Sequence, residues 1–246
     1  MSNREIIKCR TADDLCRRAA ELFIALAKQA IRNAGQFTVA LSGGSTPKAL
    51  YSLLASPQYG ELMDWSNVHL FWGDERCVPP DHRESNYRLV EDTLLSKIRI
   101  PEANVHRMAG EQAPVVAAAE YEAELKNFFK IRTISWPRFD LILLGLGEDG
   151  HTASLFPGSD GLDEDKHLVA AVYVEKLKAH RLTLTLPVLN RAARVIYLVA
   201  GSSKAQILEQ LLHGDAASRK FPAGRVNPAD GELTWIVDAA AAALLS

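Results

Sequence analysis

Residues 140–157 read DLILLGLGEDGHTASLFP, and this stretch decides the predicted fold. Its apolar first half is typical of a buried strand, and the glycines that follow let the backbone turn sharply. The loop then presents Asp149 and His151, two residues apart. Because ligands of open α/β sheets bind at the carboxyl ends of the strands, this pair predicts acid–base chemistry there.

Similar apolar runs lie on both sides of this stretch, and segments with helical periodicity alternate with them. Strands are predicted at 6–9, 37–41, 68–72, 139–145, 168–174, 181–186, 195–199 and 233–237. Helices are predicted at 11–30, from Pro47 onward, at 84–98, 114–129 and 203–213, and in the alanine-rich segment after Asp238. The alternation predicts an α/β fold, with one domain over residues 1–246. Its mostly parallel, Rossmann-like sheet would carry helices on both faces.

Composition excludes several classes of protein. The net charge is −2 and no long run has one sign, which argues against nucleic-acid binding. No apolar run reaches about 18 residues, so no membrane span is expected, and the first residues lack the apolar core of a secretory signal. A cytoplasmic location is therefore expected. The oligomeric state is left open, with a monomer favoured.

The three cysteines, Cys9, Cys16 and Cys77, are scattered and form no CxxC pair or metal-ligand cluster. They are predicted to be reduced thiols, and no metal site is expected from them. Cys77 follows a charged triplet, so an exposed and reactive thiol is the alternative there.

A glycine-rich turn follows the strand at 37–41. Gly43, Gly44, Ser45 and Thr46 lie between this strand and the start of a helix. Free backbone N–H groups at such a place can hold a phosphate, although the run does not match GxxxxGK[ST]. A tight turn that merely caps the helix is the alternative.

Charged residues follow the strand at 68–72. Asp74, Glu75 and Arg76 come where the sheet would open to a ligand. Charged loop residues are usually solvated, which is the alternative interpretation.

The glycines of the opening stretch satisfy GxGxxG, but a dinucleotide site is rejected. Glu148 and Asp149 would face the pyrophosphate, and Pro157 with Gly158 interrupts the long helix that the motif requires. A catalytic His151 is favoured over a structural one, because the residue lies in a glycine loop beside Asp149.

Lys204 lies in the first turn after the strand at 195–199, and Arg181 begins the strand at 181–186. A cation at a helix start opposes the helix dipole, which favours anion binding over a solvated position. A surface role is the alternative for Arg181. Together, the strand ends predict a pocket for a small phosphorylated molecule, with Asp149 and His151 for proton transfer.

Five motifs occur in order and together resemble the 6-phosphogluconolactonase family over nearly the whole chain. They are residues 41–47, LSGGSTP; 73–76, GDER; 85–88, SNYR; 145–157, GLGEDGHTASLFP; and 201–205, GSSKA. The related glucosamine-6-phosphate deaminases share the Asp-Gly-His core. Arg76 and the run that follows His151 favour the lactonases, since the deaminases have Asp-Glu-Tyr and an Ile-Ala-Phe-Asn-Glu-Pro-like run instead.

The resemblance implies cofactor-free hydrolysis of 6-phospho-D-glucono-1,5-lactone, a step of the oxidative pentose phosphate pathway. His151 would be the general base, oriented by Asp149, and Arg76 with the Gly43–Gly44 backbone would stabilise charge at the carbonyl or hold the substrate. The remaining implied roles are phosphate binding by Ser45, Thr46, Arg181 and Lys204, and sugar binding by Asp74 and Asn86.

Two alternatives stay open. One is an aldose–ketose isomerase and deaminase, in which Asp74 would act over C2 of an amino sugar. The other is a non-catalytic sensor that binds sugar phosphates in the same pocket.

Overall fold

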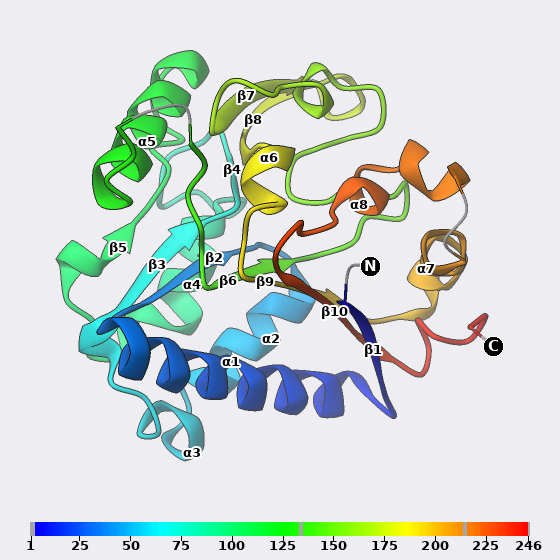
Figure 1. The fold of residues 1–246 in the computed structure, drawn as a ribbon, viewed down its shortest axis with the longest axis horizontal. Helices are drawn as coiled ribbons and strands as arrows, with labels where there is room; N and C mark the ends of the chain where they lie inside the picture. Colours follow the sequence, from blue (N-terminus) through cyan, green and yellow to red (C-terminus); the bar gives the residue numbers. More distant parts are fainter. Residues whose placement is uncertain (1–2, 133–134, 214–215, 246) are drawn as a thin grey trace.

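The main sheet is parallel throughout. The computed structural model describes residues 3–132, 135–213 and 216–245, and in these ranges seven strands join in one sheet (Figure 1). Their order across the sheet is β1 (Asn3–Cys9), β10 (Glu232–Asp238), β9 (Arg194–Val199), β6 (Leu141–Leu144), β2 (Phe37–Leu41), β3 (Val68–Trp72) and β5 (Val105–His106). The stretch at residues 140–157 contains β6, the middle strand of this sheet. The predicted mostly parallel sheet is confirmed.

Helices cover both faces of this sheet, as predicted. In Figure 1, α1 and α2 lie below the strands, whereas α5, α6 and α8 lie above them. The helices are α1 (Ala12–Ala34), α2 (Ser45–Leu54), α3 (Pro57–Gly60), α4 (Asn86–Thr93), α5 (Pro114–Phe128), α6 (Leu186–Leu189), α7 (Ala205–Leu212) and α8 (Pro222–Arg225).

The longest helix, α1, shows how local sequence sets these elements. The Thr11 hydroxyl accepts the backbone N–H of Asp14 at 3.1 Å and caps the first turn. Gly35 ends the helix in the left-handed conformation, at φ 78°. Between them, Leu15, Phe23 and other apolar residues at helical spacing are buried against the sheet.

A second, smaller sheet is antiparallel, which the sequence did not predict. It consists of β4 (Asp74–Arg76), β8 (Ala179–Leu184) and β7 (Val169–Val174), in that order. Only residues 175–178 join β7 to β8, whereas parallel neighbours need a crossover of about a dozen residues. The charged triplet predicted as a loop is thus a short strand, paired with β8.

Three predicted helices differ from the structure. The helix expected at 84–98 is α4, followed by a separate 3₁₀ turn at Leu95–Lys97. The helix expected from 203 is preceded by a 3₁₀ turn, Ser202–Lys204. The helix predicted after Asp238 is wrong: residues 239–244 form turns. Asp238 does accept the N–H of Ala241 at 2.7 Å, but its carboxylate is shared with the Gly201 N–H at 3.1 Å, and the residues that follow form turns without continuing into a helix.

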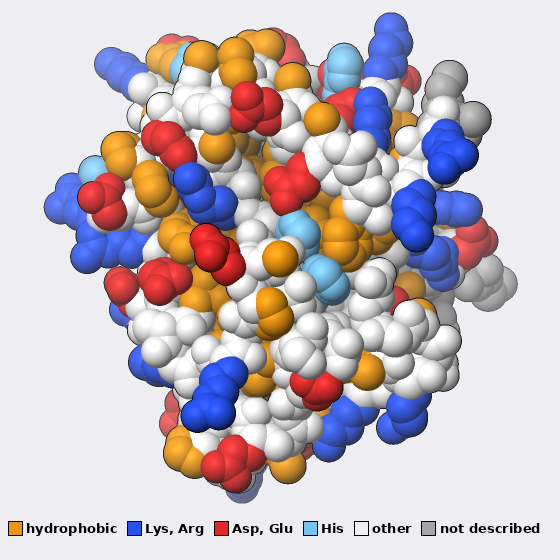
Figure 2. Space-filling view, turned by 90° about the vertical axis from the view of Figure 1, so that its left-hand side faces the viewer, with side chains coloured by type: hydrophobic (Ala, Val, Ile, Leu, Met, Phe, Trp, Pro, Cys, Tyr) orange, Lys and Arg blue, Asp and Glu red, His pale blue; other side chains and the backbone are white. Residues whose placement is uncertain are grey.

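The central strands are buried on both faces. Every residue of β2 and β6 is buried, as expected for a parallel sheet between helix layers. Acidic and basic side chains are interspersed over the face in Figure 2. Among the helices in the described ranges, none is long and apolar enough to cross a membrane. The carboxyl ends of β2, β3, β6 and β9 meet at one edge of the sheet, where the candidate site lies.

Candidate active site

A cavity of about 270 Å³ opens where these strands end. Except for Asp149 and Arg181, all the predicted site residues line it: Gly43, Gly44, Ser45, Thr46, Asp74, Arg76, Asn86, His151 and Lys204. The topology therefore brings the four strand ends to one cavity, as expected from the rule that open α/β sheets bind ligands at strand ends.

The glycine loop after β2 carries the start of α2 into the cavity. Gly44 precedes the helix at φ 107°, and no side chain caps its first turn, so backbone N–H groups there remain to bind a ligand. A Cβ on Gly43 would lie 1.9 Å from the Asn86 Oδ1, so only glycine fits. The buried Tyr51 hydroxyl accepts the Ser42 N–H at 3.0 Å and donates to its carbonyl at 2.8 Å, which fixes the loop.

Glu75, the middle residue of β4, is hydrogen-bonded to Arg76 and to the start of α4. Its buried carboxylate accepts the backbone N–H groups of Arg76, Asn86 and Tyr87, each at 2.7 Å, and the Ser85 hydroxyl at 3.2 Å. Burial raises the pKa of Glu75, and the backbone N–H groups partly oppose this effect. Glu75 therefore ties β4 to the start of α4, which places Arg76 and Asn86 at the cavity.

Asp74 lies at the cavity wall with both carboxylate oxygens bound. The Ser154 hydroxyl donates to Oδ2 at 2.7 Å, and the Asn86 side-chain amide donates to Oδ1 at 3.3 Å. By contrast, the buried Ser42 Oγ and Asn86 Oδ1 have no hydrogen-bond partner among the described residues. Buried polar atoms normally have partners, so these two are exceptions at the edge of the cavity.

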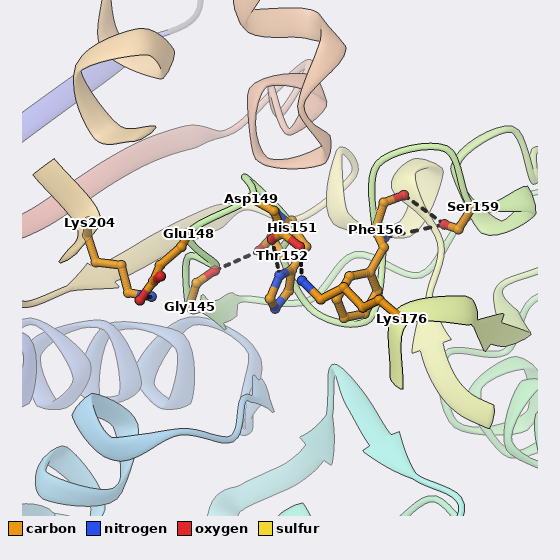
Figure 3. A network of polar contacts seen from close by, with 9 residues as sticks. All are labelled: Gly145, Glu148, Asp149, His151, Thr152, Phe156, Ser159, Lys176 and Lys204. Carbon is orange, nitrogen blue, oxygen red and sulfur yellow. Dashed lines mark hydrogen bonds and ion pairs between the residues drawn. The ribbon is translucent and has the colours of Figure 1, made fainter. Parts of the chain in front are cut away.

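His151 and Asp149 form a hydrogen-bonded pair (Figure 3). The His151 Nδ1 lies 2.5 Å from Asp149 Oδ1. Because a carboxylate only accepts, Nδ1 carries the proton and Nε2 is left as the basic nitrogen. Partial burial raises the pKa of Asp149, but hydrogen bonds from Lys176 and His151 outweigh it and hold that pKa well below its usual range.

The environment of His151 is closely packed. A Cβ on Gly147 would lie 2.0 Å from the His151 Nδ1, so the second glycine of GxGxxG makes room for the imidazole. The ring stacks on Phe156, with centroids 4.2 Å apart and planes at 23°. Ala153, two residues after His151, has φ 47°, which is uncommon for a residue with a Cβ. Such strain is typical of functional loops.

Two cations flank the cavity. Lys204 lines it and lies 3.6 Å from a Glu148 carboxylate oxygen. Arg181 does not line the cavity, but it occupies the position on β8 that is directly opposite Arg76 on β4. Burial and the nearby Arg76 charge lower the pKa of Arg181. Within the described ranges, no group of three His, Cys, Asp or Glu side chains is placed to hold a metal ion.

Four residues that shape the site had no predicted role: Tyr51, Glu75, Ser154 and Lys176. Glu75 and Ser154 lie inside the motifs at 73–76 and 145–157, so their closeness in sequence to predicted site residues could have identified them. Tyr51 and Lys176 carried no local signal, because their partners come from other elements. Cys77 is half-buried, and burial raises the pKa of its thiol, which disfavours the reactive alternative.

Comparisons with known proteins agree with the motifs. The sequence profile described as "Glucosamine-6-phosphate isomerases/6-phosphogluconolactonase" matches residues 10–235. A Synechocystis protein named 6-phosphogluconolactonase is 45% identical over 211 residues, which is 85% of each chain. A Nostoc protein of that name is 40% identical over 243 residues, 98% of each chain.

A solved structure shows the same architecture. The structure titled 6-phosphogluconolactonase from Trypanosoma cruzi is 31% identical and superposes with a TM-score of 0.86, covering 100% of this chain and 98% of that one. The resemblance stated from the motifs is thus confirmed over almost all of the sequence. The chain belongs to the glucosamine-6-phosphate isomerase/6-phosphogluconolactonase family.

Proposed function

We propose that this protein hydrolyses 6-phospho-D-glucono-1,5-lactone to 6-phosphogluconate, with His151 as the general base. The observation that carries the proposal is the His151–Asp149 pair at the cavity, with Nδ1 on the carboxylate at 2.5 Å. Relatives that bear the lactonase name over most of this chain supply the reaction and substrate.

In the proposed reaction, His151 Nε2 takes a proton from water as the oxygen attacks the lactone carbonyl carbon. A tetrahedral intermediate forms, and its oxyanion is stabilised by Arg76 and by backbone N–H groups at Gly43–Gly44. The imidazolium then returns the proton to the ring oxygen as the C–O bond breaks, so the base ends neutral. Asp149 stays ionised and stabilises the imidazolium.

Separate groups of residues are proposed to bind the phosphate and the sugar. Ser45 and Thr46 at the start of α2, with Lys204 and Arg181, would bind the phosphate, since backbone N–H groups and cations suit an anion. Asp74 and Asn86 would contact the sugar hydroxyls, and the unpartnered Asn86 Oδ1 supports this role.

A deaminase is the second candidate, and the environment of Asp74 argues against it. An isomerase would need this carboxylate free to move a proton at C2. Here Ser154 binds one of its oxygens and Asn86 the other. In the lactonase mechanism Asp74 transfers no proton and only accepts hydrogen bonds from a fixed position, which these contacts supply.

Parallel assays of the phospholactone and glucosamine 6-phosphate test the proposal, with acid or ammonia release as the readout. We expect acid release from the lactone, undiminished by a chelator, and no ammonia. His151→Ala should lower kcat by roughly 10²–10⁴-fold, the usual contribution of a general base. Near-normal turnover in that variant, after subtraction of spontaneous hydrolysis, would contradict the mechanism. Binding without turnover of either compound would instead indicate a sensor.

A further inference from the structure

Lys176 reaches the catalytic pair from a distant part of the chain. It lies in the 3₁₀ turn Glu175–Leu177 between β7 and β8. Its Nζ donates to Asp149 Oδ2, while His151 occupies Oδ1 of the same carboxylate. The carboxylate is therefore held at both oxygens, by the lysine on one side and the imidazole on the other (Figure 3).

The same ammonium group lies over Phe156, which also contacts the imidazole. Its Nζ is 5.5 Å from the centroid of the Phe156 ring, within range of a cation–π interaction. That ring stacks on His151 at 4.2 Å. Lys176 thus contacts both groups that fix the imidazole: the carboxylate bound to Nδ1 and the ring against its face.

Neither folding stability nor direct substrate contact accounts well for these contacts. The Lys176 side chain is 58% exposed, and ion pairs of exposed residues add little to stability. Lys176 is also not among the residues that line the cavity. Its charge is directed at the partner of the base, where a fixed carboxylate keeps the proton on Nδ1 and Nε2 free.

We propose that Lys176 is a positioning residue, which holds Asp149 and Phe156 so that His151 presents its Nε2 to the substrate. The proposal rests on the function proposed above, in which His151 is the base. The other charged groups around the cavity are Arg76, Asp74 and Lys204 with Glu148, and they are unchanged in the variants below.

Three variants test the proposal by kinetics: Lys176→Met, Lys176→Arg and the control Lys178→Met. Lys178 is exposed two residues away, so its replacement removes the same charge from the same segment. We expect Lys176→Met to lower kcat about tenfold, a fraction of the 10²–10⁴-fold that a general base contributes, with KM changed less than about twofold. Lys176→Arg should recover most of the rate, and Lys178→Met should behave as the wild type.

Other kinetic results would overturn the proposal. Equal losses in Lys176→Met and Lys178→Met would mean that the lysines only attract an anionic substrate. A raised KM with unchanged kcat in Lys176→Met would mean that Lys176 binds the substrate directly. Unchanged kinetics in Lys176→Met would mean that the contact with Asp149 has no role in positioning.

Substrate-free NMR separates this proposal from the proposed function. Titration of the Asp149 carboxyl carbon should show its pKa rising toward the usual range in Lys176→Met but not in Lys178→Met. The His151 ring nitrogens should shift in Lys176→Met from one tautomer toward a mixture of two. If both signals match the wild type, Lys176 does not position the pair. If they change as expected while the wild type leaves the lactone intact, the positioning stands and the proposed reaction fails.

Discussion

Arg76 and Arg181 occupy directly opposed positions on the antiparallel strands β4 and β8. Opposed residues of such a pair point to the same face of the sheet, where like charges repel. The pKa of Arg181 is lowered by burial and by the Arg76 charge, so the arrangement has an electrostatic cost. An anion bound beside Arg76, which lines the cavity, would relieve that cost.

Arg181→Gln tests whether Arg181 binds the substrate phosphate. A charge-assisted hydrogen bond is worth about 1.5–3 kcal/mol, so KM for the phospholactone should rise by about tenfold or more while kcat changes little. Steady-state kinetics with phosphorylated and unphosphorylated gluconolactone is the measurement. Arg10→Gln, at a side chain that is 93% exposed, is the control. Equal losses with both lactones would exclude a phosphate contact for Arg181.

Lys204→Ala should also raise KM for the phospholactone, by about tenfold or more, without affecting the unphosphorylated lactone. Replacing the ion-pair partner of Lys204 should change KM in the opposite direction. Glu148→Gln should lower KM for the phospholactone modestly, because the phosphate no longer competes with a carboxylate 3.6 Å from Lys204. The same two-substrate comparison measures both. If Lys204→Ala slows the two lactones by one factor, the lysine is not a phosphate ligand.

Glu75→Gln should destabilise the fold. A glutamine amide nitrogen cannot accept the N–H groups that the carboxylate now accepts from Arg76, Asn86 and Tyr87. Each unsatisfied buried group costs about 1–3 kcal/mol, so the free energy of unfolding in urea should fall by at least about 1 kcal/mol. Glu120→Gln, at an exposed position of α5, should leave it unchanged. Equal stability of the two variants would show that Glu75 is not an anchor.

Asp149 predicts a pH dependence of stability. Its pKa is lower in the folded protein than in the unfolded chain, so the carboxylate stabilises the fold above the usual aspartate pKa, about 3.9. This contribution is lost as pH falls below that value toward the folded pKa. The wild type should therefore exceed Asp149→Asn in unfolding free energy at pH 7, by about 1 kcal/mol or less given the exposure of the pair. The difference should shrink at pH 3, as urea titrations can measure. A difference independent of pH would contradict the assignment.

Much of the fold could be predicted from the sequence because its signals are local. Apolar runs such as residues 37–41 and 195–199 correspond to β2 and β9 to within a residue. Thr11 begins α1 as its hydroxyl and spacing indicate. The helix predicted after Asp238 was wrong, because alanine-rich composition favours a helix only weakly and these residues form turns.

The candidate site also has a part that local sequence predicts and a part that depends on tertiary contacts. The sequence by itself determined that four strands end in polar, glycine-containing loops, one of them with His151 beside Asp149, because a strand followed by glycine and polar residues is a local pattern. Only the tertiary structure decided that Lys176 holds Asp149, that Arg181 faces Arg76, and that Tyr51 fixes the loop at Ser42. These contacts depend on strand pairing and helix packing between residues distant in the chain or on different elements, and no local spacing encodes them.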